Sequence, residues 1–281
     1  MYKDDTIYYP QDEMTTFLLP VTTGCSYNKC AFCSMYKDTK YSEVSFSDIE
    51  TQLINGYVYT EKVFLIGAET MSIGFDKMKK LLDMIHEHLP YCGCVASYAS
   101  VKNIRDYSVE ELNILHDAGL RLLYIGFETG RDDILKLMNK GHRVDEAIKQ
   151  AKKLNEANIP FNSIIMYGIA GKGESVENAI ATAKMINQFI TRKVITMNLN
   201  IVSGTELNSM LERGDFILPE ENERLLEIKT LLENLQPKKQ MIFDTTHPTN
   251  IFKIKGTLPQ DKARLIDEVT NQIKNTTQIK Y

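Results

Sequence analysis

Short apolar runs alternate along this chain with longer stretches in which apolar residues recur every three or four positions. The longer stretches have the period of amphipathic helices, as at Met78, Leu81, Leu82 and Ile85. Strands that alternate with such helices are typical of a parallel sheet with right-handed crossovers. The short runs predict buried strands at residues 16–21, 62–66, 94–98, 122–127, 161–166 and 194–200.

Two predicted helices begin with a capping signature. Ser47 precedes Glu50, and Ser108 precedes Glu111, at the spacing of a capping box. We therefore expect helices to start at Ser47 and at Ser108. Gly119 follows the second of these helices and predicts its end, because glycine readily adopts the left-handed conformation that often follows a helix.

Six strand–helix units predict an α/β fold, a partial (β/α)6 barrel related to the eight-stranded α/β barrel. In such barrels the active site is built from the loops that follow the strands. Unusual residues occur in four of these loops: three cysteines after the first strand, Glu69 after the second, Glu128 after the fourth and a glycine-rich segment at 168–173 after the fifth. We expect these loops to form one site.

The pattern of alternating strands and helices does not extend through the last quarter of the chain. We predict a lead-in at residues 1–14, a barrel at residues 15–210 and a mostly helical extension at residues 211–281 that packs on the barrel. Within the extension, two amphipathic helices flank a mixed, extended stretch at residues 241–258.

The composition is that of an ordinary globular protein, with 43% hydrophobic and 25% charged residues. The net charge of −4 disfavours nucleic acid or an anionic membrane as a partner, although a local basic patch would make nucleic acid a candidate partner again. No run approaches the ~18 apolar residues of a transmembrane helix, and the polar N-terminus lacks the apolar core of a signal peptide. We expect a cytoplasmic protein.

Three of the five cysteines, Cys25, Cys30 and Cys33, lie within nine positions of one polar loop. Thiolates are soft ligands that select zinc, copper(I) or iron–sulfur clusters. Because structural zinc sites and most clusters take four protein ligands, three cysteines favour a [4Fe–4S] cluster with one iron left open. The alternatives are a zinc site completed by a distant histidine, or buried thiols. We expect Cys92 and Cys94 to be structural.

With these residues in view, the chain resembles the radical S-adenosylmethionine (SAM) superfamily, in particular the branch of oxygen-independent coproporphyrinogen oxidase relatives and Elp3/MiaB-like enzymes. The resemblance covers about residues 15–207 and is carried by the cysteine loop, Gly126-Phe127-Glu128-Thr129-Gly130 and Gly204-Thr205. It implies that the three cysteines hold a [4Fe–4S] cluster whose open iron binds SAM. The CX4CX2C spacing departs from the common motif, which has one residue fewer between the first two cysteines.

The resemblance also implies which residues hold the methionyl part of SAM. Gly67, Ala68 and Glu69 match the segment whose backbone and acid meet the SAM amino group. Glu128 matches a residue that reaches the methionyl group or the ribose. Lys140 matches a basic position that meets the SAM carboxylate, where the family usually has arginine.

The same resemblance implies a binding site for the adenine of SAM. Phe32 matches the aromatic position whose backbone lies near the adenine, and the segment containing Gly168 and Gly171 matches the one that packs against it. The segment is not a phosphate-binding loop, because Lys172 is followed by Gly173 rather than by serine or threonine.

Three residues are candidates for contact with the substrate. Tyr98 and Tyr167 lie at strand ends and are expected to line the cavity, or else to form the rim of the core. His247 lies in a polar run at residues 244–250 that could cover the barrel mouth, or could be a simple polar turn.

The implied chemistry is reductive cleavage of SAM to a 5′-deoxyadenosyl radical, which abstracts hydrogen from a small-molecule substrate. Flavodoxin or ferredoxin is implied as the electron donor, since the chain has no second cluster motif. Two alternatives remain: an RNA- or protein-modifying enzyme of the same superfamily, and an iron–sulfur electron carrier or scaffold without SAM turnover.

Overall fold

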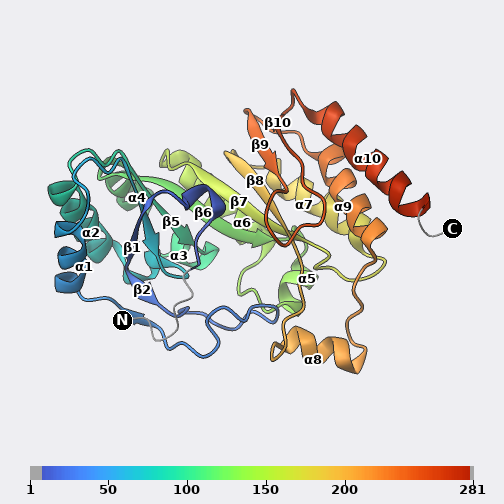
Figure 1. The fold of residues 1–281 in the computed structure, drawn as a ribbon, viewed down its shortest axis with the longest axis horizontal. Coiled ribbons are helices and arrows are strands. Elements are labelled where there is room, and N and C mark those ends of the chain that lie inside the picture. Colours follow the sequence, from blue (N-terminus) through green and yellow to red (C-terminus); the bar gives the residue numbers. More distant parts are fainter. Residues whose placement is uncertain (1–7, 279–281) are drawn as a thin grey trace. The chain divides into compact units, whose positions relative to one another are not determined.

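The computed structural model of the chain describes residues 8–278 and is drawn in Figure 1. The first seven residues of the predicted lead-in therefore lie outside the described residues. The chain divides into two compact units. The first contains the chain up to residue 28 together with residues 35–125 and 153–161, and the second contains residues 29–34, 126–152 and the chain from 162 onward.

The framework of the first unit is a set of parallel strands. In sheet order these are β1 (Phe17–Pro20), β4 (Lys62–Ile66), β5 (Cys94–Ala99) and β6 (Leu120–Glu128), whose last three residues belong to the second unit. The side chains of residues 63–65 in β4 have no exposed surface, as expected for a strand covered on both faces. A short antiparallel pair, β2 (Thr22–Thr23) and β3 (Ser42–Glu43), flanks the cysteine loop.

Helices follow these strands. They are α1 (Phe46–Ile54), α2 (Phe75–His88), α3 (Val101–Arg105) and α4 (Val109–Asp117), with short 3-10 helices η1 (Gln11–Glu13) and η2 (Thr70–Ile73). The apolar stripe predicted for α2 is buried, and α2 contacts both α1 and α4. The periodic pattern therefore identified the buried face of this helix correctly.

The two predicted capping sites have different outcomes. At α4 the capping box is present: Ser108 Oγ accepts from Glu111 N at 3.1 Å, and Glu111 Oε2 accepts from Ser108 N at 2.7 Å. At α1 the prediction is wrong by two residues, because Ser45 is the N-cap and accepts from Asp48 N at 3.2 Å. Ser47 lies inside the first turn instead, since the extended backbone ends at Ser45.

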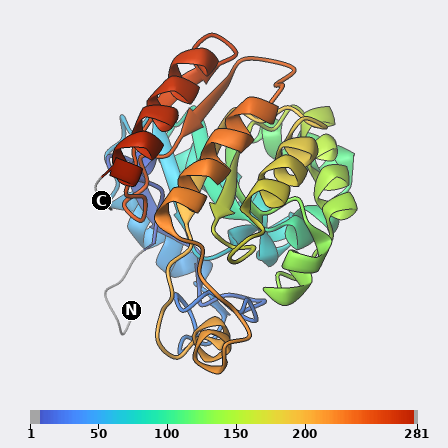
Figure 2. The ribbon, with the colours of Figure 1, turned by 90° about the vertical axis from the view of Figure 1, so that its right-hand side faces the viewer.

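The second unit continues the same alternation. Its elements are α5 (Asp132–Leu137), α6 (Val144–Glu156), β7 (Phe161–Tyr167), α7 (Ser175–Ile186), β8 (Lys193–Asn198), α8 (Glu206–Arg213), α9 (Glu221–Asn234), β9 (Met241–Asp244), β10 (Lys255–Leu258) and α10 (Lys262–Gln278). The last four residues of α6 and the first residue of β7 belong to the first unit. Strands β7, β8 and β9 are parallel, and β10 is antiparallel to β9. Helices α7, α9 and α10 lie side by side, as Figure 2 shows.

The parallel strands and intervening helices confirm the predicted α/β class. The extension is mostly helical, and its extended stretch forms β9 and β10, so that β9 adds to β8 in the sheet. Helix α8 was not predicted. No helix in the described part of the chain is long and apolar enough to cross a membrane.

Candidate active site

In the first unit, Glu69 organises the start of the cysteine loop. The residue is 4% exposed, and its Oε1 accepts from Ser26 Oγ at 2.5 Å and from Tyr27 N at 3.2 Å. The Cys25 thiol also donates to this oxygen, at 3.5 Å. Burial, followed by the charge of Glu69, raises the pKa of the Cys25 thiol to about 11. The acid predicted to meet a ligand thus also holds the backbone that presents the first cysteine.

Gly67 and Ala68 connect β4 to this acid. Gly67 has φ +152°, and a Cβ atom placed there would overlap the Thr22 hydroxyl. Only glycine can therefore pass so close to the strand beside it. Ala68 lies between Gly67 and Glu69 and is half-buried.

In the second unit, residues 29–34 of the cysteine loop are anchored through Ala31. Ala31 N donates to Met138 O, and Leu207 N donates to Ala31 O, both at 2.9 Å. The Ala31 side chain belongs to an apolar cluster with Met138, Leu207 and others, against which Phe32 packs. The chain between Cys30 and Cys33 is thereby fixed from both sides.

Glu128 and Lys140 form a buried ion pair in the same unit. Glu128 Oε1 lies 2.6 Å from Lys140 Nζ, and the two side chains are 7% and 17% exposed. Glu128 is held at φ +64°, which is unusual for a residue with a side chain, and its Oε2 has no hydrogen-bond partner among the described residues. Such strain and an unpaired buried acceptor are common at functional sites.

Lys140 connects this pair to other predicted ligand residues. Its Nζ lies 5.8 Å from the centre of the Phe32 ring. Burial lowers the pKa of Lys140, but the charge of Glu128 and the nearby Cys30 and Cys33 raise it by more, so the pKa lies above its ordinary value. The structure thus brings Phe32, Glu128 and Lys140 together near two of the three cysteines.

His142, two residues further on, is buried as a neutral ring. Burial and the charge of Lys140 lower its pKa to about 3, although its hydrogen bond with the Phe127 backbone opposes this shift. Its Nε2 has no hydrogen-bond partner among the described residues.

The glycine segment after β7 is held by a residue that the sequence reading missed. Gly168 and Gly171 have φ +79° and +87°, and Gly168 N donates to Glu227 Oε2 at 2.8 Å. Glu227 comes from α9 and is 3% exposed. The sequence signal that could have identified Glu227 is its position next to the apolar stripe of a predicted helix, with Leu231 one turn later.

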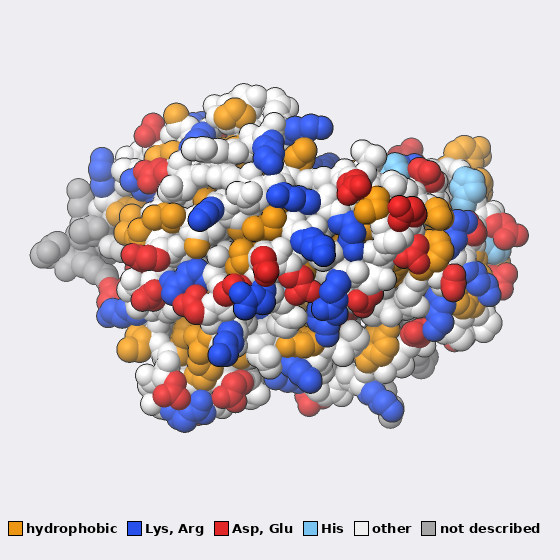
Figure 3. Space-filling view, turned by 180° about the vertical axis from the view of Figure 1, so that it is seen from behind, with side chains coloured by type: hydrophobic (Ala, Val, Ile, Leu, Met, Phe, Trp, Pro, Cys, Tyr) orange, Lys and Arg blue, Asp and Glu red, His pale blue; other side chains and the backbone are white. Residues whose placement is uncertain are grey.

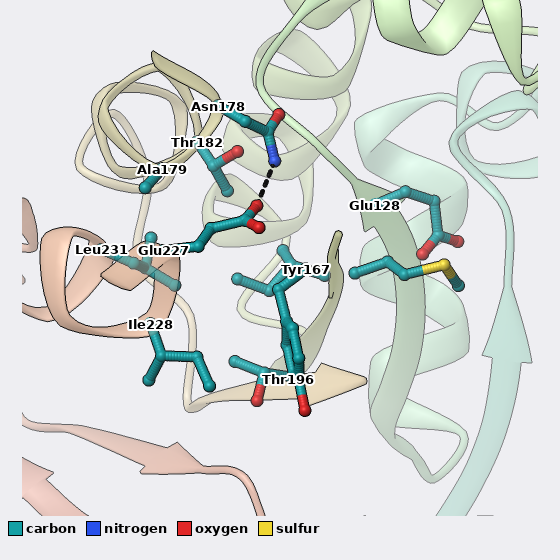
Figure 4. Close-up of a pocket in the computed structure, with 11 residues that line it drawn as sticks. Glu128, Tyr167, Asn178, Ala179, Thr182, Thr196, Glu227, Ile228 and Leu231 are labelled. Atoms are coloured by element: carbon teal, nitrogen blue, oxygen red, sulfur yellow. Dashed lines mark hydrogen bonds between the residues drawn. The ribbon is translucent and has the colours of Figure 1, made fainter. Parts of the chain in front are cut away.

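Glu227 also completes a series of hydrogen bonds that joins the loop after β6 to the loop after β7, drawn in part in Figure 4. Thr129 Oγ1 donates to Asn178 Oδ1, and Asn178 Nδ2 donates to Glu227 Oε1 at 2.7 Å. Asn178 and Glu227 border a small pocket that is open to solvent, and Glu128 and Tyr167 also line it. Burial raises the pKa of Glu227 to about 7, against the lowering effect of its hydrogen bonds.

The three substrate candidates lie in different surroundings. Besides the pocket beside Glu227, a second pocket lies at the ends of β7 and β8. Tyr98 packs edge-on against Phe64, with ring centres 5.4 Å apart, and lines neither of these two pockets. Tyr167 lines both pockets, and its hydroxyl donates to Asn250 Oδ1 at 3.1 Å. His247 is half-buried, lies 2.8 Å from Thr249 Oγ1, and lines neither pocket.

The cysteines fit an iron–sulfur cluster by their donor chemistry. All three are partly buried and none is in a disulfide. Cys25 belongs to the first unit, and Cys30 and Cys33 belong to the second. Over residues 8–278, no three His, Cys, Asp or Glu side chains are grouped as in a metal site. The ligand set therefore rests on three reduced thiols in one short loop and stays a proposal.

The parallel α/β fold and the cysteine loop after its first strand define the chain as an α/β protein with a candidate iron–sulfur site. Sequence comparison identifies its family. The profile described as "Radical SAM superfamily" matches residues 19–186, more than half of the chain. The chain belongs to the radical SAM superfamily. This confirms the predicted resemblance, and it makes the chain an enzyme whose cofactors are a [4Fe–4S] cluster and SAM.

Individual relatives are distant. The heme chaperone HemW of Bacillus subtilis is 26% identical over 199 residues, which cover 69% of this chain and 51% of HemW. The tRNA uridine(34) acetyltransferase of Methanocaldococcus infernus is 26% identical over 147 residues, which cover 52% of this chain and 27% of that protein. The chain thus spans about half of the first relative and about a quarter of the second.

A solved structure supports the fold. The archaeal Elp3 of Methanocaldococcus infernus aligns with 93% of this chain and 63% of its own, with a TM-score of 0.59 and 16% sequence identity. At this identity the likeness concerns the fold alone.

Proposed function

We propose that this enzyme cleaves SAM reductively and uses the resulting radical to abstract hydrogen from a small-molecule substrate. The observation that carries the proposal is the buried Glu128–Lys140 pair beside Phe32, in the unit that also contains Cys30 and Cys33. When bound, the cluster and SAM supply a 5′-deoxyadenosyl radical. The protein's own residues bind and orient the cofactors and exclude water.

Each candidate residue has a defined part in this proposal. Cys25, Cys30 and Cys33 would hold the cluster. Lys140, which is paired with Glu128, would attract the carboxylate of SAM. The unpaired Oε2 of Glu128 remains available to accept from a ligand hydroxyl or ammonium group.

Other candidate residues would hold the two ends of SAM. Glu69, with the backbone of Gly67 and Ala68, would accept from the SAM amino group, since an ammonium group needs acceptors at fixed positions. Gly168 and Gly171 would let the backbone approach the adenine, because neither carries a side chain.

A small-molecule substrate agrees with the charge of the chain. The net charge is −4, and on the face shown in Figure 3 the Lys and Arg side chains lie among Asp and Glu side chains. A surface of mixed charge does not attract the phosphate backbone as a basic face does. We propose flavodoxin or ferredoxin as the electron donor.

A tRNA substrate is the second candidate. A relative of the chain is named as a tRNA uridine(34) acetyltransferase, and the matched region covers half of this chain. Because the chain is an enzyme of this superfamily, the electron-carrier interpretation is no longer proposed.

Anaerobic reconstitution tests the proposal. The purified chain should take up about four irons and release 5′-deoxyadenosine when dithionite and SAM are added. Cys30→Ala should lose both the cluster and the release, whereas the matched control Cys92→Ala should keep both, because Cys92 lies outside the cysteine loop. Iron analysis and chromatography of the products measure the two quantities.

Three outcomes would count against the proposal. A wild-type chain that takes up iron but releases no 5′-deoxyadenosine would contradict the reaction. A Cys30→Ala variant that kept a full cluster would contradict the ligand set. Release that rises only when tRNA is added would favour the second candidate.

A further inference from the structure

A second pocket lies where β7 and β8 end. It is open to solvent and is lined by Tyr167 and Asn198, the last residues of these strands, and by Arg224 from α9. The carboxyl ends of strands are where α/β barrels place their substrates. None of the predicted cofactor-binding residues lines this pocket.

Arg224 is a half-buried cation whose hydrogen bonds leave part of its guanidinium group unused. Nη1 donates to Asn198 Oδ1 at 2.5 Å, and Nε donates to Pro219 O at 3.0 Å. Both acceptors are uncharged. Among the described residues, Nη2 has no hydrogen bond and no carboxylate forms an ion pair with Arg224.

Glu227 and Glu223 act on the Arg224 charge without contacting the guanidinium group, and Nη2 is not a buried atom, so a ligand can reach it. Burial lowers the pKa of Arg224, while Tyr167, Glu227 and Glu223 raise it by less. The two bonds to neutral oxygens hold the side chain in place, so that its open edge is pre-organised. A guanidinium edge matches a carboxylate, which it can bind through two parallel hydrogen bonds.

The rest of the pocket wall is largely apolar. Leu225 and Ile228 of α9 are buried, and Phe252 is half-buried. Ile251, by contrast, is 73% exposed at the rim, where an apolar ligand would cover it. One acid, Glu221, also borders the pocket, but its side chain is exposed and solvent screens its repulsion of an anion.

We propose that this pocket binds a small molecule with one carboxylate group and an apolar body, with the carboxylate on Arg224. That this molecule is the substrate rests on the proposed function; the binding itself does not. The C-terminal extension would then supply the group that recognises the substrate.

Binding of benzoate tests the site, with benzamide as its neutral analogue of the same shape. Saturation-transfer NMR on the full chain should give saturable benzoate binding and at least ~10-fold weaker benzamide binding, as expected for a charge-assisted hydrogen bond. Arg224→Gln should weaken benzoate about tenfold or more without changing benzamide. Arg213→Gln is the matched control, since Arg213 is exposed on α8 and lines neither pocket.

Two further measurements keep the test decisive. Release of 5′-deoxyadenosine by the wild-type chain is measured in parallel: benzoate binding without this release would contradict the reaction and leave the site standing, so the two failures are distinguishable. If Arg224→Gln does not fold, Arg224→Lys should still bind benzoate more weakly than wild type, because lysine lacks the planar fork.

Equal binding of benzoate and benzamide, or unchanged benzoate affinity in the Arg224 variants, would overturn the proposal. Displacement of benzoate by S-adenosylhomocysteine would assign the pocket to SAM and overturn the substrate assignment.

Discussion

At the scale of single residues, the Glu128–Lys140 pair determines the electrostatics of the second unit's part of the site. Both side chains are largely out of solvent, and one oxygen of Glu128 has no hydrogen-bond partner among the described residues. The attraction between the two charges therefore offsets the free-energy cost of removing them from water only while both partners are present.

Lys140→Met should destabilise the cofactor-free chain by about 3 to 5 kcal/mol, because it leaves Glu128 buried without a partner. The control is Lys79→Met, which breaks the exposed pair with Asp83 (N–O distance 2.6 Å) and should cost less than about 1 kcal/mol. Urea unfolding measures both free energies. Equal costs for the two variants would show that Glu128 is adequately solvated without Lys140.

Glu227 predicts a pH dependence of stability. Its pKa is raised by burial from 4.5 to about 7, so between these pH values the folded state binds more protons than the unfolded state. The free energy of unfolding of the wild type, relative to Glu227→Gln, should therefore fall by about 3 kcal/mol as pH rises from 4.5 to about 7, and should change little at higher pH.

Urea unfolding at several pH values measures this difference. Glu233→Gln on the same helix is the control and should leave the pH profile unchanged, because its side chain is 42% exposed. A wild-type profile parallel to that of Glu227→Gln would mean that Glu227 stays ionised in the fold.

At the scale of elements, close backbone approach fixes the position of α7 beside the loop after β6. A Cβ atom at Gly130 would overlap the carbonyl oxygen of Ala181 in α7, and Gly130 N donates to Thr182 Oγ1 at 2.9 Å. The loop that follows Glu128 and the helix that contains Asn178 are therefore packed with no room for a side chain at Gly130.

Gly130→Ala should lower the free energy of unfolding by about 1 to 3 kcal/mol, because a helix backbone must move to admit the methyl group. Gly93→Ala is the control: Gly93 is exposed, nothing lies within 4 Å of its added Cβ, and the change should be neutral or slightly stabilising. Thermal unfolding of both variants measures the effect. A neutral Gly130→Ala would mean that α7 shifts without cost.

Local signals predicted the elements well. The buried strands and the capping box at Ser108 follow from period and spacing, which act within a few residues. Ser47 misled because Ser45 offers the same hydroxyl two residues earlier, where the backbone is still extended. Such a choice between neighbouring caps depends on where the helix meets the rest of the fold.

At the scale of the whole molecule, the alternation of strands and helices predicted the α/β class, and the cysteine loop with its flanking motifs predicted the superfamily that the profile then confirmed. The series of hydrogen bonds from Thr129 through Asn178 to Glu227 could not be predicted, because it joins residues about fifty positions apart. The same holds for Arg224, whose open edge is visible only once Asn198 and Pro219 are in place.

The two backbone hydrogen bonds of Ala31 have a consequence for the assembly of the cofactor. Where a metal site forms only on metal binding, ordering the chain reduces the observed free energy of binding. Here residues 30–33 are already held by Met138 and Leu207. The conformational entropy of the backbone around the two cysteines of the second unit is therefore lost on folding, before any iron binds.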